Sequence, residues 1–100
     1  MKTKGRKAHM KWLEVIKLRS GRKDSGLLEE LLRSIHEFSQ SGLLEMKTLR
    51  HAVLETDLSV HLYWESEQPE KNGSPLGLHL AQALREFGLI DHSVWIEEEK

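Results

Sequence analysis

Residues 58–65, LSVHLYWE, alternate between apolar and mostly polar side chains, and no other feature of the sequence restricts the fold as much. The apolar positions are Leu58, Val60, Leu62 and Trp64, and the positions between them are Ser59, His61, Tyr63 and Glu65. A period of two residues predicts a β-strand with two different faces. Such a strand needs neighbouring strands for its backbone and a covering layer for its apolar face. The chain is therefore expected to build a sheet that carries helices.

Three further segments have strand character: residues 12–19, residues 44–54 and residues 90–97. They are rich in branched and aromatic side chains, and Gly, Pro or charged polar segments separate them from their neighbours. Residues 55–57 are short enough to join the second and third strands as a hairpin.

Two segments have helical spacing. The first runs from Gly26 towards Gly42, with Asp24 or Ser25 as its N-cap. Its apolar stripe consists of Leu28, Leu31, Leu32, Ile35 and Phe38. The second begins with Ser74 as N-cap and Pro75 at the first helical position, and it ends before Gly88. Its stripe consists of Leu76, Leu80, Ala83, Leu84 and Phe87.

The predicted order is β-α-β-β-α-β, which is the split β-α-β pattern of ferredoxin-like folds. Both apolar stripes can pack on one face of a four-stranded antiparallel sheet. The predicted fold class is therefore α+β, with two helices on one face of the sheet and an open second face.

A three-residue turn predicts the hairpin register. It places Leu54 opposite Leu58, His51 opposite His61, and Lys47 opposite Glu65. It also places Arg50 on the apolar face, where an edge position or a bulge would have to accommodate it.

The open face is expected to carry His61 and Tyr63, with Leu49 and Val53 beside them. The first strand adds apolar side chains whichever way it turns, and the last strand adds either Trp95 or the pair Val94 and Ile96. A mixed apolar face of this size is uncommon on a monomer. The sequence therefore predicts a homodimer formed through the open face.

The charges are distributed unevenly along the chain. Residues 1–23 hold nine Lys or Arg and one acid, whereas residues 24–100 hold six Lys or Arg and fifteen acids. We interpret residues 1–10 as a basic tail and residues 11–100 as one domain. The tail is either a solvated terminus or a contact for an anionic surface. The acidic domain argues against nucleic acid as a partner.

The chain contains no cysteine, so disulfides, thiolate metal sites and cysteine nucleophiles are excluded. No apolar run approaches the roughly 18 residues that span a bilayer. No apolar segment of a leader peptide follows the basic terminus. We expect a cytoplasmic protein without a membrane-embedded part.

The element order, the length and the open face with tyrosine and histidine resemble the dimeric α+β barrel proteins, over residues 11–97. That family includes cofactor-free monooxygenases of the antibiotic-biosynthesis type, and no catalytic motif of the family matches this chain. The segment SGLLEEL, with Gly26, Leu27 and Leu28, is also similar to the first helix of the ACT domain, a regulatory module that binds amino acids. Ser25 stands where that domain usually has proline.

The candidate cavity or interface residues are His51, His61, Tyr63 and Trp95. His51 and His61 could ligate a metal only with a third ligand, and neither Glu14 nor Glu65 stands at a diagnostic spacing. The sequence predicts no metal and no cofactor. His92 is expected either at a sheet edge or within the open-face cluster.

Three function classes remain at this level. The first is a dimeric interaction protein, the second is a cofactor-free enzyme or small-ligand binder, and the third is an ACT-like regulatory module. The residues name no substrate, no reaction and no physiological partner.

Overall fold

The structure is a computed structural model that describes residues 9–20 and 26–98 of the 100-residue chain. The N-cap candidates Asp24 and Ser25, and most of the basic tail, lie outside the described residues. The elements in chain order are β1 (Met10–Arg19), α1 (Gly26–Ile35), β2 (Leu43–Arg50), β3 (Asp57–Ser66), α2 (Pro75–Leu84), the short 3-10 helix η1 (Arg85–Phe87) and β4 (Leu89–Ile96).

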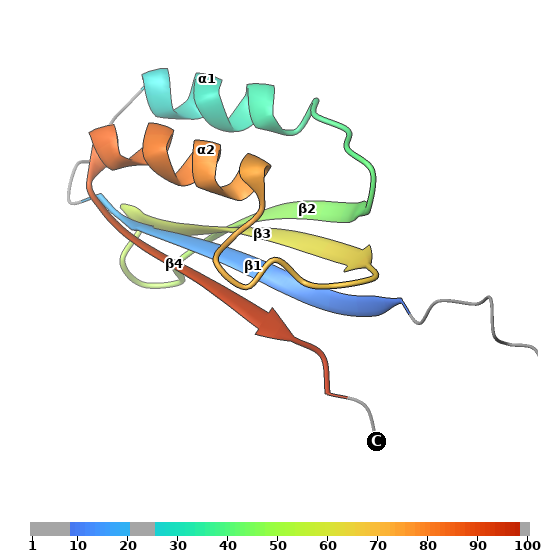
Figure 1. The fold of residues 1–100 in the computed structure, drawn as a ribbon. Helices are drawn as coiled ribbons and strands as arrows, with labels where there is room; N and C mark the ends of the chain where they lie inside the picture. The colour runs from blue at the N-terminus through green and yellow to red at the C-terminus, as the bar shows by residue number, and fades with distance from the viewer. Residues whose placement is uncertain (1–8, 21–25, 99–100) are drawn as a thin grey trace, which may run out of the picture.

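The strands form one antiparallel sheet in the order β2-β3-β1-β4. Figure 1 shows α1 and α2 side by side on one face of this sheet, while the opposite face carries no helix. The predicted fold class is confirmed: the chain is a ferredoxin-like α+β protein with its two central strands, β1 and β3, paired along their whole length.

The helix-covered face holds the core because the alternating strand positions and the two helical stripes meet there. Leu58, Val60, Leu62 and Trp64 are all buried, as the alternation in residues 58–65 predicts. Strand β1 turns Trp12, Ile16 and Leu18 towards the helices, so Leu13 and Val15 belong to the open face. The indole rings of Trp12 and Trp64 stack in this core with a centroid separation of 5.4 Å.

The second helix begins as the sequence predicts. The Ser74 hydroxyl accepts a hydrogen bond from the Gly77 amide at 2.9 Å, and Pro75 occupies the first helical position. This hydroxyl satisfies one of the amide groups that a helix N-terminus leaves unpaired.

The first helix is shorter than its apolar spacing predicts. It ends at Ile35, and Phe38, expected in the inner stripe, has 55% of its surface exposed. Residues 36–42 contain two serines and end in Gly42, whose φ of 90° favours glycine. Because serine side chains compete with helical backbone hydrogen bonds, this segment turns back towards β2 instead of continuing the helix.

The predicted hairpin register is wrong by four positions, since Lys47 and not His51 lies opposite His61. Residues 51–56 form a six-residue loop closed by its own hydrogen bonds, including the Asp57 amide to the Leu54 carbonyl oxygen at 2.8 Å. An even shift leaves the side chains of residues 45–50 on their predicted faces. Arg50 is therefore still on the helix side, where edge strand β2 lets it reach Glu29 of α1 at 3.3 Å. Val53, expected on the open face, and Leu54, expected opposite Leu58, lie instead in the loop because β2 ends at Arg50.

Candidate functional site

The open face of the sheet is the side of β1 to β4 that neither helix covers (Figure 1). Its side chains form rows across the four strands, because β1 pairs in continuous register with β3 and β4, and β2 does so with β3 from Glu45 onwards. Listed from β2 to β4, three successive rows are Glu45, Tyr63, Leu13 and Trp95; then Lys47, His61, Val15 and Ser93; then Leu49, Ser59, Lys17 and Asp91.

One end of this face is apolar and aromatic. The Trp95 side chain lies there with 62% of its surface exposed, and its indole nitrogen donates to the Ser93 hydroxyl at 2.9 Å. Leu44, which is 56% exposed, lies at the irregularity where β2 shifts register against β3. Together with Leu13 and Tyr63 these side chains line a shallow depression of about 320 Å³. We call this region the aromatic end.

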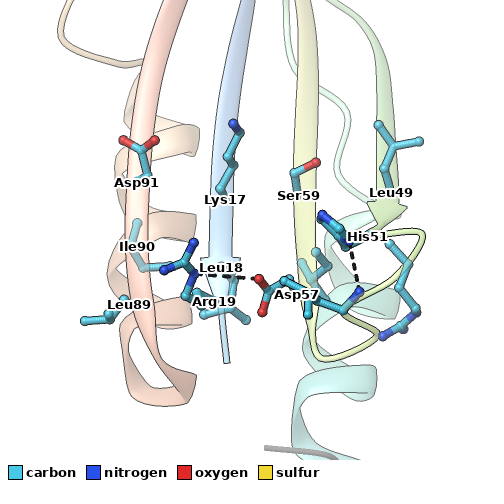
Figure 2. A pocket seen from close by; sticks show the side chains of 13 residues that line it. Lys17, Leu18, Arg19, Leu49, His51, Asp57, Ser59, Leu89, Ile90 and Asp91 are labelled. Carbon is cyan, nitrogen blue, oxygen red and sulfur yellow. Dashed lines mark hydrogen bonds and ion pairs between the residues drawn. The ribbon is translucent and has the colours of Figure 1, made fainter. Parts of the chain in front are cut away.

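The other end is hollowed beside the 51–56 loop, and Figure 2 shows this hollow from close by. Its volume is about 550 Å³. Lys17, Ser59, Leu49 and Asp91 line it from four different strands, as one row of the sheet. The volume falls within the range of roughly 300–1,000 Å³ in which small-molecule sites are found.

His51 shapes one wall of the hollow and does not pair with His61. Its Nδ1 atom accepts hydrogen bonds from the amides of Val53 at 3.0 Å and Leu54 at 2.9 Å. This imidazole therefore holds the loop in its turn (Figure 2). An Nδ1 atom that accepts two amide hydrogen bonds is occupied and cannot act as a base there.

His61 lies in the middle of the open face, where it is partly buried. Its Nε2 atom is 3.1 Å from the Ser59 hydroxyl, and its ring centroid is 6.2 Å from that of Tyr63. Partial burial, followed by the charges of Lys17 and Lys47, lowers the pKa of His61 below its usual 6.5. The imidazole is therefore mainly neutral at pH 7, with both donor and acceptor capacity.

The open face thus brings together three of the four candidate residues, His61, Tyr63 and Trp95, while His51 lies in the adjoining loop. Within residues 9–20 and 26–98, no three His, Asp or Glu side chains converge as metal ligands would. Neither helix in this part of the chain is long and apolar enough to cross a membrane.

A second polar cluster lies under the helices, and the sequence reasoning did not find it. Glu14 projects from β1 into the core with no exposed surface, and its carboxylate accepts four hydrogen bonds. The donors are Trp64 Nε1 at 3.0 Å, the Ser74 amide at 3.0 Å, the Ser74 hydroxyl at 2.7 Å and His92 Nε2 at 2.6 Å. The sequence contained one indication of this cluster: Glu14 shares a strand face with the apolar residues Trp12, Ile16 and Leu18.

All four groups donate to the same carboxylate, so the cluster holds α2 against the sheet and does not assemble a nucleophile. The Ser74 hydroxyl donates to Glu14 and not to an imidazole, so no base is placed to activate it. His92 lies on edge strand β4, as one of its two expected positions had it, but its side chain is on the helix side and not in the open-face cluster. The negative charge of Glu14 also faces the positive end of the α2 dipole.

The architecture defines the chain as a ferredoxin-like α+β protein with an open, partly apolar sheet face. Comparison with protein-family models, curated proteins and solved structures finds no match to this chain. Function is therefore inferred from the geometry of the open face itself.

Proposed function

We propose that this chain works as a homodimer in which the open faces of two copies pack against each other. The observation that carries the proposal is the aromatic end, where Trp95 has 62% of its surface exposed beside Leu44, Leu13 and Tyr63. Burying a tryptophan removes roughly 150–250 Å² of surface from water. One partner of a standard interface buries about 800 Å², so a single tryptophan supplies a substantial share of that area.

The charges of the open face support a second copy as the partner. The strands place four basic and four acidic side chains on this face: Lys11, Lys17, Arg19, Lys47, Glu45, Asp57, Glu65 and Asp91. Glu97, which follows β4 and lines the aromatic end, adds one acid, so the face is close to neutral. A nearly neutral face can meet itself across a two-fold axis without strong overall repulsion. A strongly charged face would require a partner of opposite sign.

Light scattering on the purified chain tests the dimer. The expected mass is near twice 11.6 kDa. Trp95→Lys should raise the dimer dissociation constant about tenfold or more, because a charged side chain would replace the largest apolar contact. Leu78→Lys is the matched control, since Leu78 is 50% exposed on α2, away from the open face. A monomeric wild type at micromolar concentration would contradict the proposal, as would equal effects of the two substitutions.

A second candidate function is small-molecule binding, and the hollow of about 550 Å³ favours it. The hollow combines apolar walls with Lys17, Ser59 and Asp91, as expected of a site that orients a small ligand. In the dimer it would be enclosed between the two sheets. This function corresponds to the ligand-binding class of dimeric α+β barrels and makes no assumption about a reaction.

NMR screening with small organic acids, alcohols and amines tests the second candidate. Binding in the hollow should shift the amide signals of Lys17, His51 and Ser59, and His61→Ala should alter the binding while the chain stays folded. Shifts confined to the helices, or no shift with any compound, would contradict ligand binding at this place.

A further inference from the structure

Two lysines flank strand β3 at the margin of the hollow. Lys17 of β1 lies opposite Ser59, and Lys47 of β2 lies opposite His61. The two β3 residues are themselves joined by the contact of 3.1 Å between the Ser59 hydroxyl and His61 Nε2. The register therefore places a hydroxyl and an imidazole between two ammonium groups.

The ammonium group of Lys17 is the available cation of the hollow. Among the described residues, no carboxylate lies within 4.0 Å of it, although Asp91 lies opposite it on β4. The other two cations that line the hollow are already paired: Arg19 is 3.7 Å from the Asp57 carboxylate, and Arg50 is 3.3 Å from the Glu29 carboxylate. A ligand that meets Lys17 consequently displaces no existing ion pair.

Exposed leucines form part of the lining of the hollow that holds this cation. Leu49 is 45% exposed, Leu54 is 51% exposed and Leu89 is 73% exposed, and all three line the hollow. Exposed leucines beside an unpaired cation suit a ligand with an anionic head and an apolar body.

We infer that the hollow binds a small monocarboxylate, with its head on Lys17 and Ser59 and its apolar body against Leu49 and Leu54. The inference rests on the ligand-binding function proposed above. In the tautomer in which His61 Nε2 donates to the Ser59 oxygen, the Ser59 hydroxyl and the Lys17 ammonium both donate hydrogen bonds to the ligand, which matches a carboxylate.

The charges around the site select a single negative charge. Asp91 is the neighbour of Lys17 on β4, and Asp57 lies two residues from Ser59 on the same face of β3, so these two carboxylates would repel a second negative charge on the ligand. Lys17 and Lys47 flank Ser59 and His61 from the two neighbouring strands, and their charges favour a bound anion there. The same two charges add to the effect of partial burial in lowering the pKa of His61.

Amide chemical-shift titration of the full chain with hexanoate, 1-hexanol and hexylamine tests the inference. Hexanoate should bind with a millimolar dissociation constant and shift the amides of Lys17, Ser59 and Leu54. 1-Hexanol, which has the same tail and no charge, should bind about tenfold more weakly or worse, and hexylamine should not bind preferentially. Bound hexanoate should also raise the pKa of His61, because a nearby anion stabilises the imidazolium.

Lys17→Met removes the cation and keeps the apolar stem, and it should weaken hexanoate binding about tenfold without affecting 1-hexanol. Lys11→Met is the matched control, because Lys11 lies on the same face of the same strand at the aromatic end, and it should change the affinity less than about twofold.

The outcomes separate this inference from the function on which it rests. If 1-hexanol or hexylamine binds the hollow as well as hexanoate does, the carboxylate assignment is wrong while ligand binding stands. Equal losses from Lys17→Met and Lys11→Met would also overturn the assignment. If none of the three compounds binds, both the assignment and ligand binding in the hollow are overturned. The dimer is measured separately by light scattering on the same samples.

Discussion

Replacement of Glu14 by glutamine tests whether the buried carboxylate stabilises this fold. Each carboxylate oxygen accepts two hydrogen bonds, Oε1 from Trp64 and the Ser74 hydroxyl, and Oε2 from the Ser74 amide and His92. Glutamine turns one acceptor into a donor. His92 can respond by changing its tautomer, and the Ser74 hydroxyl can rotate, but the Ser74 amide and the Trp64 indole can only donate.

The expected loss of stability follows from these contacts. In either orientation of the amide, one fixed donor is left without an acceptor, which costs roughly 1–3 kcal/mol when buried. The surviving hydrogen bonds lose their charge assistance, at about 1 kcal/mol each. Relief from burying a negative charge works in the opposite direction. We expect Glu14→Gln to lower the free energy of unfolding by about 3 kcal/mol, which corresponds to a fall in Tm of roughly 12–24 °C.

Urea unfolding followed by tryptophan fluorescence measures this loss. Glu45→Gln is the control, since that carboxylate is 56% exposed and lies 3.8 Å from Lys47; a change within about 0.5 kcal/mol is expected. Glu14→Met removes every acceptor atom and should destabilise the protein more than Glu14→Gln does. The reasoning is refuted if Glu14→Gln costs less than about 1 kcal/mol, or if Glu14→Met is as stable as the wild type.

Gly77→Ala should destabilise the protein although alanine favours helices, because the added methyl group would overlap the Glu14 carboxylate. A double-mutant cycle tests this: the loss of stability caused by Gly77→Ala should be smaller in a Glu14→Ala background. His61 should titrate below pH 6.5 by NMR, and Lys47→Met should raise its pKa towards 6.5. Since the pKa of His61 is lower in the folded protein than in the unfolded chain, the unfolded chain binds this proton more readily. The free energy of unfolding should therefore fall as pH drops through and below 6.5, and His61→Gln should reduce that loss. His51→Ala should cost about 1 kcal/mol and speed hydrogen exchange at the amides of Val53 and Leu54, whereas unchanged exchange would contradict its role in the loop.

The apolar periodicity predicted the elements, and the structure shows why it could not predict all of their ends. Leu28, Leu32 and Ile35 follow the helical period and are buried, but Phe38 has the same spacing and is exposed because the chain has already turned. Periodicity shows which side chains would share a helix face, and it contains no information on where the next strand must begin.

The candidate site was predictable only in part, for a similar reason. Alternation in β3 placed His61 and Tyr63 on the open face, and a shift of four positions in the hairpin did not change that. The same shift replaced His51 by Lys47 as the neighbour of His61. The imidazole of His51 instead binds amides two and three residues further along the chain, and a local side-chain contact of this kind leaves no trace in the hydrophobic pattern.

The sequence by itself determined the α+β class, the order of the elements and the sides of β2 and β3 that meet the helices, because these depend on patterns repeated over neighbouring residues. The structure decided which sides of β1 and β4 do so, since both faces of those strands carry apolar residues. Only the tertiary structure decided the Glu14 cluster and the hollow. The carboxylate meets donors that are 50, 60 and 78 residues away along the chain. The hollow needs side chains from all four strands in one row. Such meetings depend on strand order and register, which loops and packing set together and no local pattern specifies.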